Sequence, residues 1–261
     1  MGGYGWISLT TDYGLSDGFV AACHGVIARL APEVRVIDVT HLISPSDVVR
    51  AAAVLAQTVP HLPPAVHVAV VDPGVGTKRR GIAIATAGGV LVGPDNGLLP
   101  WAADALGGID TVRELSNQEW FLGDVSRTFH GRDVFAPAAA RIAGGAPLDD
   151  AGPLVDADTV LRLPDPVVAV GDGWLEAEVV MVDRFGNVQL AADGALLAEL
   201  GRELVVGGVQ ARRGETFADA PPGQLLVFRD SAGRVALAVN GGRAVVLLSV
   251  TPGDVLRIAA R

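Results

Sequence analysis

The sequence has one cysteine among its 261 residues and no long apolar run. With Cys23 alone, no disulfide can form within the chain, which fits a reducing compartment. No apolar run approaches the roughly 18 residues that a membrane-spanning helix needs. The first residues also lack the basic and apolar parts of a signal peptide. We therefore expect a cytoplasmic protein with no membrane contact.

Positive charge is scarce as well. The chain carries 20 lysines and arginines against 29 acidic residues, a net charge of −9. Because a phosphate backbone is bound by a basic face, this balance argues against a nucleic-acid partner. Half of the residues are hydrophobic, so the chain can bury a sizeable core.

The short motifs of common catalytic sites are absent too. Residues 74–78 (GVGTK) lack the spacing of a phosphate-binding loop, and neither a dinucleotide-binding glycine pattern nor a Gly-x-Ser-x-Gly elbow occurs. The five histidines show no metal-site spacing, so we expect no metal. His61 and His67 flank a Pro-Pro loop, where a surface position is the simpler interpretation.

The first half alternates strand-like and helix-like segments. Apolar or alternating runs predict strands at 6–10, 34–39 and 66–71, and helical spacing predicts helices at 17–30, 47–58, 96–106 and 133–143. Residues 82–86 and 90–92 flank Gly88-Gly89 and predict a hairpin. This alternation favours an α/β domain with a largely parallel central sheet.

The second half has a different composition. Residues 144–166 are rich in Pro, Gly and Asp and read as a linker. Short Val-rich segments follow at 176–182, 203–206, 225–228, 235–239 and 255–259, separated by Gly-containing turns. They predict a smaller all-β domain, a barrel or a sandwich. We place the α/β domain at 1–155 and the all-β domain at 167–261.

Carboxylates and asparagines beside glycines recur at the ends of predicted strands: Asp12, Asp72, Asp95-Asn96, Asp183, Asn187 and Asn240. The carboxyl ends of strands are where α/β sheets bind ligands. A carboxylate can hold a ribose diol, and an asparagine can hydrogen-bond to an adenine edge. Each residue alone is equally typical of an Asx-turn or a helix cap. Their number favours a site for a polar small molecule.

Several motifs occur together in a recognisable order: TTDYGLSDGFVAACHGVI, VIDVTHLISPSDVVRAA, VVDPGVGTKRRGIAI, GPDNGLL, TFHGRDVFAPAAA, VDRFGNVQL and SAGRVALAVNGG. Over nearly the whole chain they resemble the S-adenosyl-methionine (SAM) hydroxide adenosyltransferases, which are related to the SAM-dependent fluorinase and chlorinase. The resemblance implies an enzyme that hydrolyses SAM at ribose C5′ to adenosine and methionine without a cofactor. It also implies a barrel-like second domain and a homotrimer with SAM bound at subunit interfaces.

The resemblance also implies roles for individual residues. Asp12 corresponds to the group that holds the ribose hydroxyls. Asp183 corresponds to the partner of the methionine ammonium, and Ser231 to that of its carboxylate. Asn187, Asn240 and Gly241 correspond to the adenine-binding positions. The family's catalytic Asp–Arg–His set maps onto Asp72, Arg79 and His130, in which an Asp72–His130 couple would deprotonate water while Arg79 stabilises hydroxide character.

Alternative activities remain open at this point. The halogenases lack the Asp–Arg–His combination, but Gly131 stands where the fluorinase has a halide-binding serine and where the chlorinase also has glycine. Ser46 and Ala232 replace a tryptophan and an arginine of the fluorinase. A SAM-dependent chlorinase and a non-catalytic adenosine- or SAM-binding protein are therefore the alternatives to a hydrolase.

Overall fold

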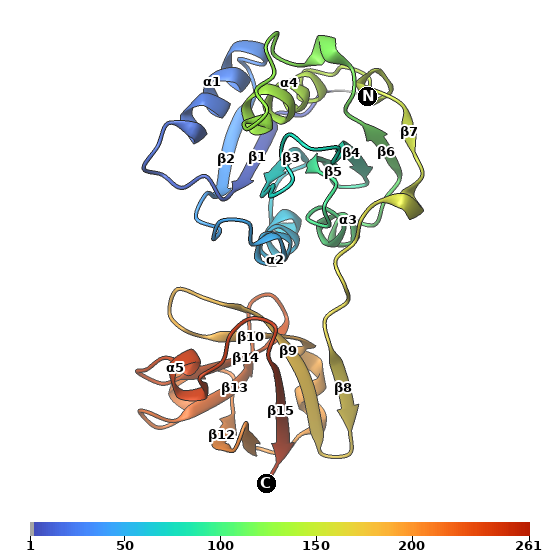
Figure 1. Cartoon of the computed structure of the whole chain (residues 1–261). Coiled ribbons are helices and arrows are strands. Elements are labelled where there is room, and N and C mark those ends of the chain that lie inside the picture. Colours follow the sequence, from blue (N-terminus) through green and yellow to red (C-terminus); the bar gives the residue numbers. More distant parts are fainter. Residues whose placement is uncertain (1–2) are drawn as a thin grey trace. The chain divides into compact units, whose positions relative to one another are not determined.

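The computed structural model describes residues 3–261 (Figure 1). The chain divides into two compact units, of which the first ends at Leu163 and the second begins at Pro164. The first unit is an α/β domain and the second is an all-β domain. Within residues 3–261, no helix is long and apolar enough to cross a membrane.

The first unit is built on a seven-stranded sheet with the order β2-β1-β3-β5-β4-β6-β7. The four strands β2, β1, β3 and β5 are parallel, whereas β4, β6 and β7 add to them in antiparallel pairs. The expected parallel core and the hairpin of β4 with β5 are both confirmed. The strands are β1 (Trp6–Thr11), β2 (Arg35–Thr40), β3 (Ala65–Val70), β4 (Gly81–Thr86), β5 (Gly89–Pro94), β6 (Thr111–Glu114) and β7 (Leu154–Val155).

Helices cover both faces of this sheet, as Figure 1 shows. The helices α1 (Phe19–Leu30) and α4 (Ala136–Ala143) pack on one face, and α2 (Val48–Thr58) and α3 (Pro100–Ala105) pack on the other. Side chains of β3 alternate between the two cores: Val68 joins the α1/α4 side, and Ala69 joins the α2/α3 side. Burial on both faces explains why β3 reads as one continuous apolar run.

Two helices begin differently from what their sequence patterns predict. The helix expected over 96–106 starts only at Pro100, because Asn96 accepts a hydrogen bond from the Leu98 amide and Gly97 adopts a φ of 96°. The helix expected over 133–143 begins as a π-helical turn, Gly131–Phe135, and becomes α-helical at Ala136. Such π-helical turns are frequent at functional sites.

The second unit is a closed barrel of seven strands, which decides between the barrel and the sandwich. Neighbours follow the order β9-β15-β11-β12-β13-β14-β10, and β10 pairs back with β9. Pairing is antiparallel except between β12 and β13, and β8 lies outside the closed ring on β9. The elements are β8 (Val168–Gly171), β9 (Trp174–Val182), β10 (Val188–Asp193), β11 (Glu203–Val206), β12 (Val209–Arg213), β13 (Leu225–Arg229), β14 (Arg234–Val239), β15 (Val255–Ala260) and the short helix α5 (Ala244–Leu248).

The expected surface position of His67 is wrong. His67 lies on β3 with no exposed surface, and its Nδ1 is 2.8 Å from the hydroxyl of Ser8 on β1. Burial lowers the pKa of His67 to about 4, so the ring is neutral at physiological pH. His61, by contrast, is exposed. The flanking Pro-Pro loop therefore separates a surface histidine from a core histidine.

Candidate active site

Two of the predicted site carboxylates meet at one edge of the parallel sheet. In the register of β1 and β3, Thr11 lies beside Val70. Asp12 directly follows β1, and Asp72 comes two residues after β3. Both side chains therefore stand at the carboxyl ends of adjacent parallel strands, the usual ligand-binding edge of such a sheet.

The structure brings Asp72, Arg79 and His130 together. Arg79 grips the Asp72 carboxylate in a two-point contact: its Nε donates to Oδ1 at 3.2 Å and its Nη2 donates to Oδ2. The same Nη2 lies 3.1 Å from His130 Nδ1. The side chains of Arg79 and Asp72 are only 9% and 5% exposed, so little of this ion pair faces bulk solvent. Arg79 thus bridges the carboxylate and the imidazole.

The loop between Asp72 and Arg79 has the shape that this bridge requires. Its turns are closed by backbone bonds from Val75 to Asp72 and from Thr77 to Gly74. Gly76 has a φ of 75°, and a Cβ there would lie 2.3 Å from the carbonyl oxygen of Arg127. Only glycine allows the loop to lie this close to the segment that leads into His130.

Electrostatics keep His130 neutral. Burial lowers its pKa and the Arg79 charge lowers it further, against the opposing effects of Asp72 and Asp133. A guanidinium can only donate hydrogen bonds, so Nδ1 of the neutral ring accepts from Arg79. The ring proton then resides on Nε2, which is left as a donor.

The two neighbouring arginines have different partners. Arg80 binds Asp95 at 2.6 Å and the carbonyl of Thr159, away from the Asp72 contact. Asp95 also accepts from the Leu161 amide, and it is 3% exposed. Asp95 therefore ties the end of β5 to the 159–161 segment through long-range contacts, and neither of these contacts is an Asx-turn or a helix cap.

Asp12 is oriented by the loop that precedes α2. Its Oδ2 accepts a hydrogen bond of 3.0 Å from the backbone amide of Ser46. Ser46 has a φ of 66°, a left-handed conformation that is uncommon for a residue with a side chain. This contact leaves Oδ1 of Asp12 available to a ligand.

Tyr13 is a site residue that our sequence analysis did not single out. Its ring packs against Phe19 and Phe129, with centroids 6.1 and 5.5 Å away. Its hydroxyl stands over Gly131, directly after His130. Burial and the nearby negative charges raise the pKa of Tyr13 well above its ordinary value, so it stays a neutral phenol. The sequence did offer one signal for this role, since Tyr13 directly follows the predicted site residue Asp12 in the TTDYG motif.

In the second unit, Asp183 and Asn187 hold each other across the turn from β9 to β10. Asp183 Oδ1 accepts from the amides of Phe185 and Asn187, and Oδ2 accepts from the Asn187 side chain at 2.7 Å. The network fixes the Asn187 side chain with Nδ2 toward Asp183. Its Oδ1 remains an acceptor for a ligand donor such as an adenine amino group.

Asn240 and Gly241 lie at the same end of the barrel as this turn, and Ser231 lies in the turn at the start of β14. Val188 pairs with both Val182 and Leu237, so the start of β10 lies beside the end of β14. Asn240 follows β14, and its Nδ2 donates to the Ala220 carbonyl at 2.7 Å. Ser231 lies in the exposed turn before β14, about 20 Å from Asn240 along that strand. Its neighbour Asp230 accepts a 2.6 Å hydrogen bond from Nε2 of Gln189, two residues after Asn187, so this turn also reaches β10.

The comparisons with known proteins match one family in both units. Residues 7–152 match the SAM hydroxide adenosyltransferase N-terminal domain, and residues 177–257 match the C-terminal domain of that family. This chain belongs to the SAM hydroxide adenosyltransferase family. The resemblance found in the sequence motifs is thereby confirmed.

Relatives in and near the family fall into two groups. A Salinispora arenicola protein named (R)-S-adenosyl-L-methionine hydrolase is 66% identical over 255 residues, 98% of each chain. An Actinoplanes protein named fluorinase is 27% identical over 90% of each chain. A crystal structure from Thermotoga maritima, titled as an uncharacterized conserved protein, has a TM-score of 0.89 and 38% identity over 98% of this chain and 100% of its own.

We expect Gly131→Ala to destabilise the protein. A Cβ at position 131 would lie 1.9 Å from the Tyr13 hydroxyl oxygen and 2.9 Å from the adjoining ring carbon. Because Phe19 and Phe129 confine the ring, the overpacking should cost about 1–3 kcal/mol in the free energy of unfolding. Denaturant unfolding followed by circular dichroism measures it.

The matched control is Gly123→Ala, since an added Cβ there meets nothing within 4 Å. The double variant Gly131→Ala/Tyr13→Phe should recover part of the loss because the closest atom is removed. Equal stability of Gly131→Ala and Gly123→Ala would show that Tyr13 is not confined.

Proposed function

We propose that this protein hydrolyses SAM, with water attacking ribose C5′ to give adenosine and L-methionine. The observation that carries the proposal is the assembly of Asp72, Arg79 and His130 at the sheet edge where Asp12 also stands. The substrate named for the 66%-identical relative supports the same reaction. The lower identity of the fluorinases favours water over halide as the nucleophile.

The chemistry asks the protein to supply a nucleophile, because the sulfonium is already a good leaving group. The water oxygen forms a bond to C5′ while the C5′–S bond breaks, and its electron pair returns to sulfur as the neutral thioether of methionine. One proton leaves the attacking water. No Lewis acid is needed for this departure, so the proposed reaction uses neither a metal nor a cofactor.

We propose different tasks for Asp72 and His130, and the bridging position of Arg79 supports this division. The Nδ1 lone pair of His130 faces Arg79, so the ring orients water through its Nε2–H donor. Asp72 is then the group that accepts the proton of the water. Base assistance of this kind is worth about 10²–10⁴-fold in rate. This division differs from the Asp72–His130 couple expected from sequence, because the guanidinium contacts both groups.

Substrate binding draws on residues of both units. In the first unit, Asp12 is proposed to hold the ribose hydroxyls. The others come from the second unit, and we propose that Asp183 contacts the methionine ammonium, Ser231 its carboxylate, and Asn187, Asn240 and Gly241 the adenine. The free oxygen of Asn187 supports its role, since adenine presents an amino donor.

We further propose that the substrate is the (R)-sulfonium epimer of SAM. The relative with 66% identity is named for that epimer, and its match covers 98% of this chain. Removing an epimer that is not the ordinary methyl donor also gives the hydrolysis a physiological purpose.

We place the protein in the cytoplasm, which the single, free and buried Cys23 supports.

Purified protein given each SAM epimer should release adenosine and methionine, faster from the (R)-epimer, as resolved by chromatography. The same incubation in excess chloride should give no 5′-chloro-5′-deoxyadenosine. Formation of the chloro product would assign the protein to the halogenases. Tight adenosine binding without turnover of either epimer would make it a non-catalytic binding protein.

Variants of the catalytic set should separate the proton acceptor from the water-orienting group. Asp72→Asn cannot take a proton and should lower kcat by about 10²-fold or more, with little change in SAM affinity. His130→Gln keeps an acceptor for Arg79 and an N–H donor for water, so it should retain far more activity than His130→Ala. The readout is initial-rate kinetics with the preferred SAM epimer.

His61→Gln is the matched control, because it makes the same substitution at an exposed histidine. If His130→Gln is as slow as Asp72→Asn, His130 is the proton acceptor instead. Parent rates in both Asp72→Asn and His130→Ala would remove the hydrolase mechanism altogether.

The proposed assembly is a homotrimer with SAM bound at subunit interfaces, since the binding residues are divided between the two units. Light scattering should then give three times the chain mass of 26.8 kDa. Dilution below the dissociation constant of the trimer should abolish turnover as the trimer dissociates. A fully active species with the mass of one chain would exclude this assembly.

A further inference from the structure

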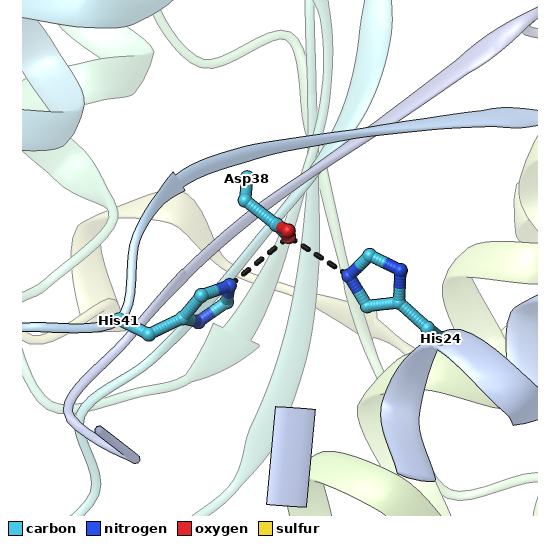
Figure 2. A group of neighbouring side chains, drawn as sticks. All are labelled: His24, Asp38 and His41. Atoms are coloured by element: carbon cyan, nitrogen blue, oxygen red, sulfur yellow. Dashed lines mark hydrogen bonds and ion pairs between the residues drawn. The ribbon is translucent and has the colours of Figure 1, made fainter. Parts of the chain in front are cut away.

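A second group of polar side chains lies on the first unit, built from residues outside the proposed catalytic set. Figure 2 shows His24 of α1, Asp38 of β2 and His41, which follows β2, with both imidazoles turned toward one carboxylate oxygen. His24 Nε2 lies 2.9 Å and His41 Nε2 lies 3.0 Å from Asp38 Oδ1. The three candidate ligand atoms all lie within 4.8 Å of one another.

The His41 ring is buried, and its position is fixed by a contact on the side away from Asp38. It is 3% exposed, and its Nδ1 lies 2.8 Å from the Thr11 hydroxyl. Its buried Nε2 lacks a well-directed hydrogen bond to any described residue, although it lies beside Asp38. A histidine whose far nitrogen contacts a hydroxyl and whose near nitrogen is buried and faces a carboxylate has the arrangement of a metal ligand with its supporting partner.

The other two members are accessible and carry suitable charge. His24 and Asp38 are 37% and 43% exposed, so an ion can reach the cluster from solvent. The Asp38 carboxylate faces two imidazole nitrogens, a set of one oxygen and two nitrogen ligands.

We propose that His24, Asp38 and His41 form a binding site for a divalent transition metal ion of the zinc class. Zinc binds imidazole nitrogen and carboxylate oxygen at about 2.0–2.2 Å, which puts tetrahedral ligands about 3.3 Å apart. The observed contacts of 2.9 and 3.0 Å need only a small outward movement to admit an ion. Two nitrogens and one oxygen suit Zn²⁺, Co²⁺ or Ni²⁺ better than Mg²⁺ or Ca²⁺, which prefer oxygen ligands.

A bound ion would join three parts of the chain. It would tie α1 to β2 through His24 and Asp38, and both to the Thr11–Gly14 turn through His41. The His41 side chain contacts Thr11, and its carbonyl accepts a 2.8 Å hydrogen bond from the Gly14 amide. Asp12 lies within that turn, so the metal would restrain the segment that carries the proposed ribose-binding carboxylate.

Metal binding is testable on the whole protein after treatment with a chelator. Titration with Co²⁺ should give one equivalent per chain with the intense visible absorption of low-coordinate cobalt. Competition by Zn²⁺ should displace it, and Zn²⁺ should raise the Tm, because a ligand bound only by the folded state stabilises that state. His24→Gln and Asp38→Asn should each weaken binding by about tenfold or more.

His61→Gln is again the matched control and should bind like the parent. Because His24 is partly exposed, the metal-free Tm of His24→Gln should equal that of the parent, which excludes misfolding as the cause of lost binding. The proposal is overturned if neither Co²⁺ nor Zn²⁺ binds stoichiometrically. It is equally overturned if His24→Gln keeps the parent's affinity and its Zn²⁺-dependent rise in Tm.

Discussion

The two-point grip of Arg79 on Asp72 is the contact on which the site depends. It neutralises a carboxylate that is 5% exposed and would otherwise be buried unpaired. The same guanidinium reaches His130 and sets which ring nitrogen carries the proton. It also lies 5.3 Å from the Phe135 ring centroid, so the π-helical turn after His130 packs against it. One cation therefore connects the loop after β3 with the turn before α4.

Local patterns predicted the elements whose neighbours are close in sequence. The β4–β5 hairpin follows from two apolar runs around Gly88-Gly89, and the parallel core follows from alternation of strands and helices. The strand β10 and the short helix α5 were not predicted. β10 is a six-residue segment right after the DRFGN turn, and α5 is a single turn that no capping side chain marks. β10 pairs with β9 across that turn and also with β14 about 40 residues later, and the Val245 amide of α5 donates to the Gly186 carbonyl of the same turn, so both elements depend on contacts that are distant in sequence.

The sequence motifs predicted which residues belong to the site. Only the structure shows which of these residues contact one another. Arg79 and Arg80 are equivalent in sequence, but one reaches Asp72 and the other reaches Asp95. No short metal-binding motif contains His24, Asp38 and His41. They come together only because α1 packs beside the end of β2. The surface interpretation of His67 failed because β3 is buried on both faces and the Ser8 hydroxyl on the neighbouring strand contacts Nδ1 of the ring. In each case a long-range contact decides the role.

The packing of Tyr13 over Gly131 also limits how such a site can change over evolutionary time. Any residue larger than glycine at 131 first meets the tyrosine hydroxyl, so a serine cannot arrive there by one tolerated step. The tyrosine, or the aromatic residues Phe19 and Phe129 that confine it, must change beforehand. The order of substitutions is thus constrained. Relatives that keep Tyr13, Phe19 and Phe129 are expected to keep glycine at position 131 as well.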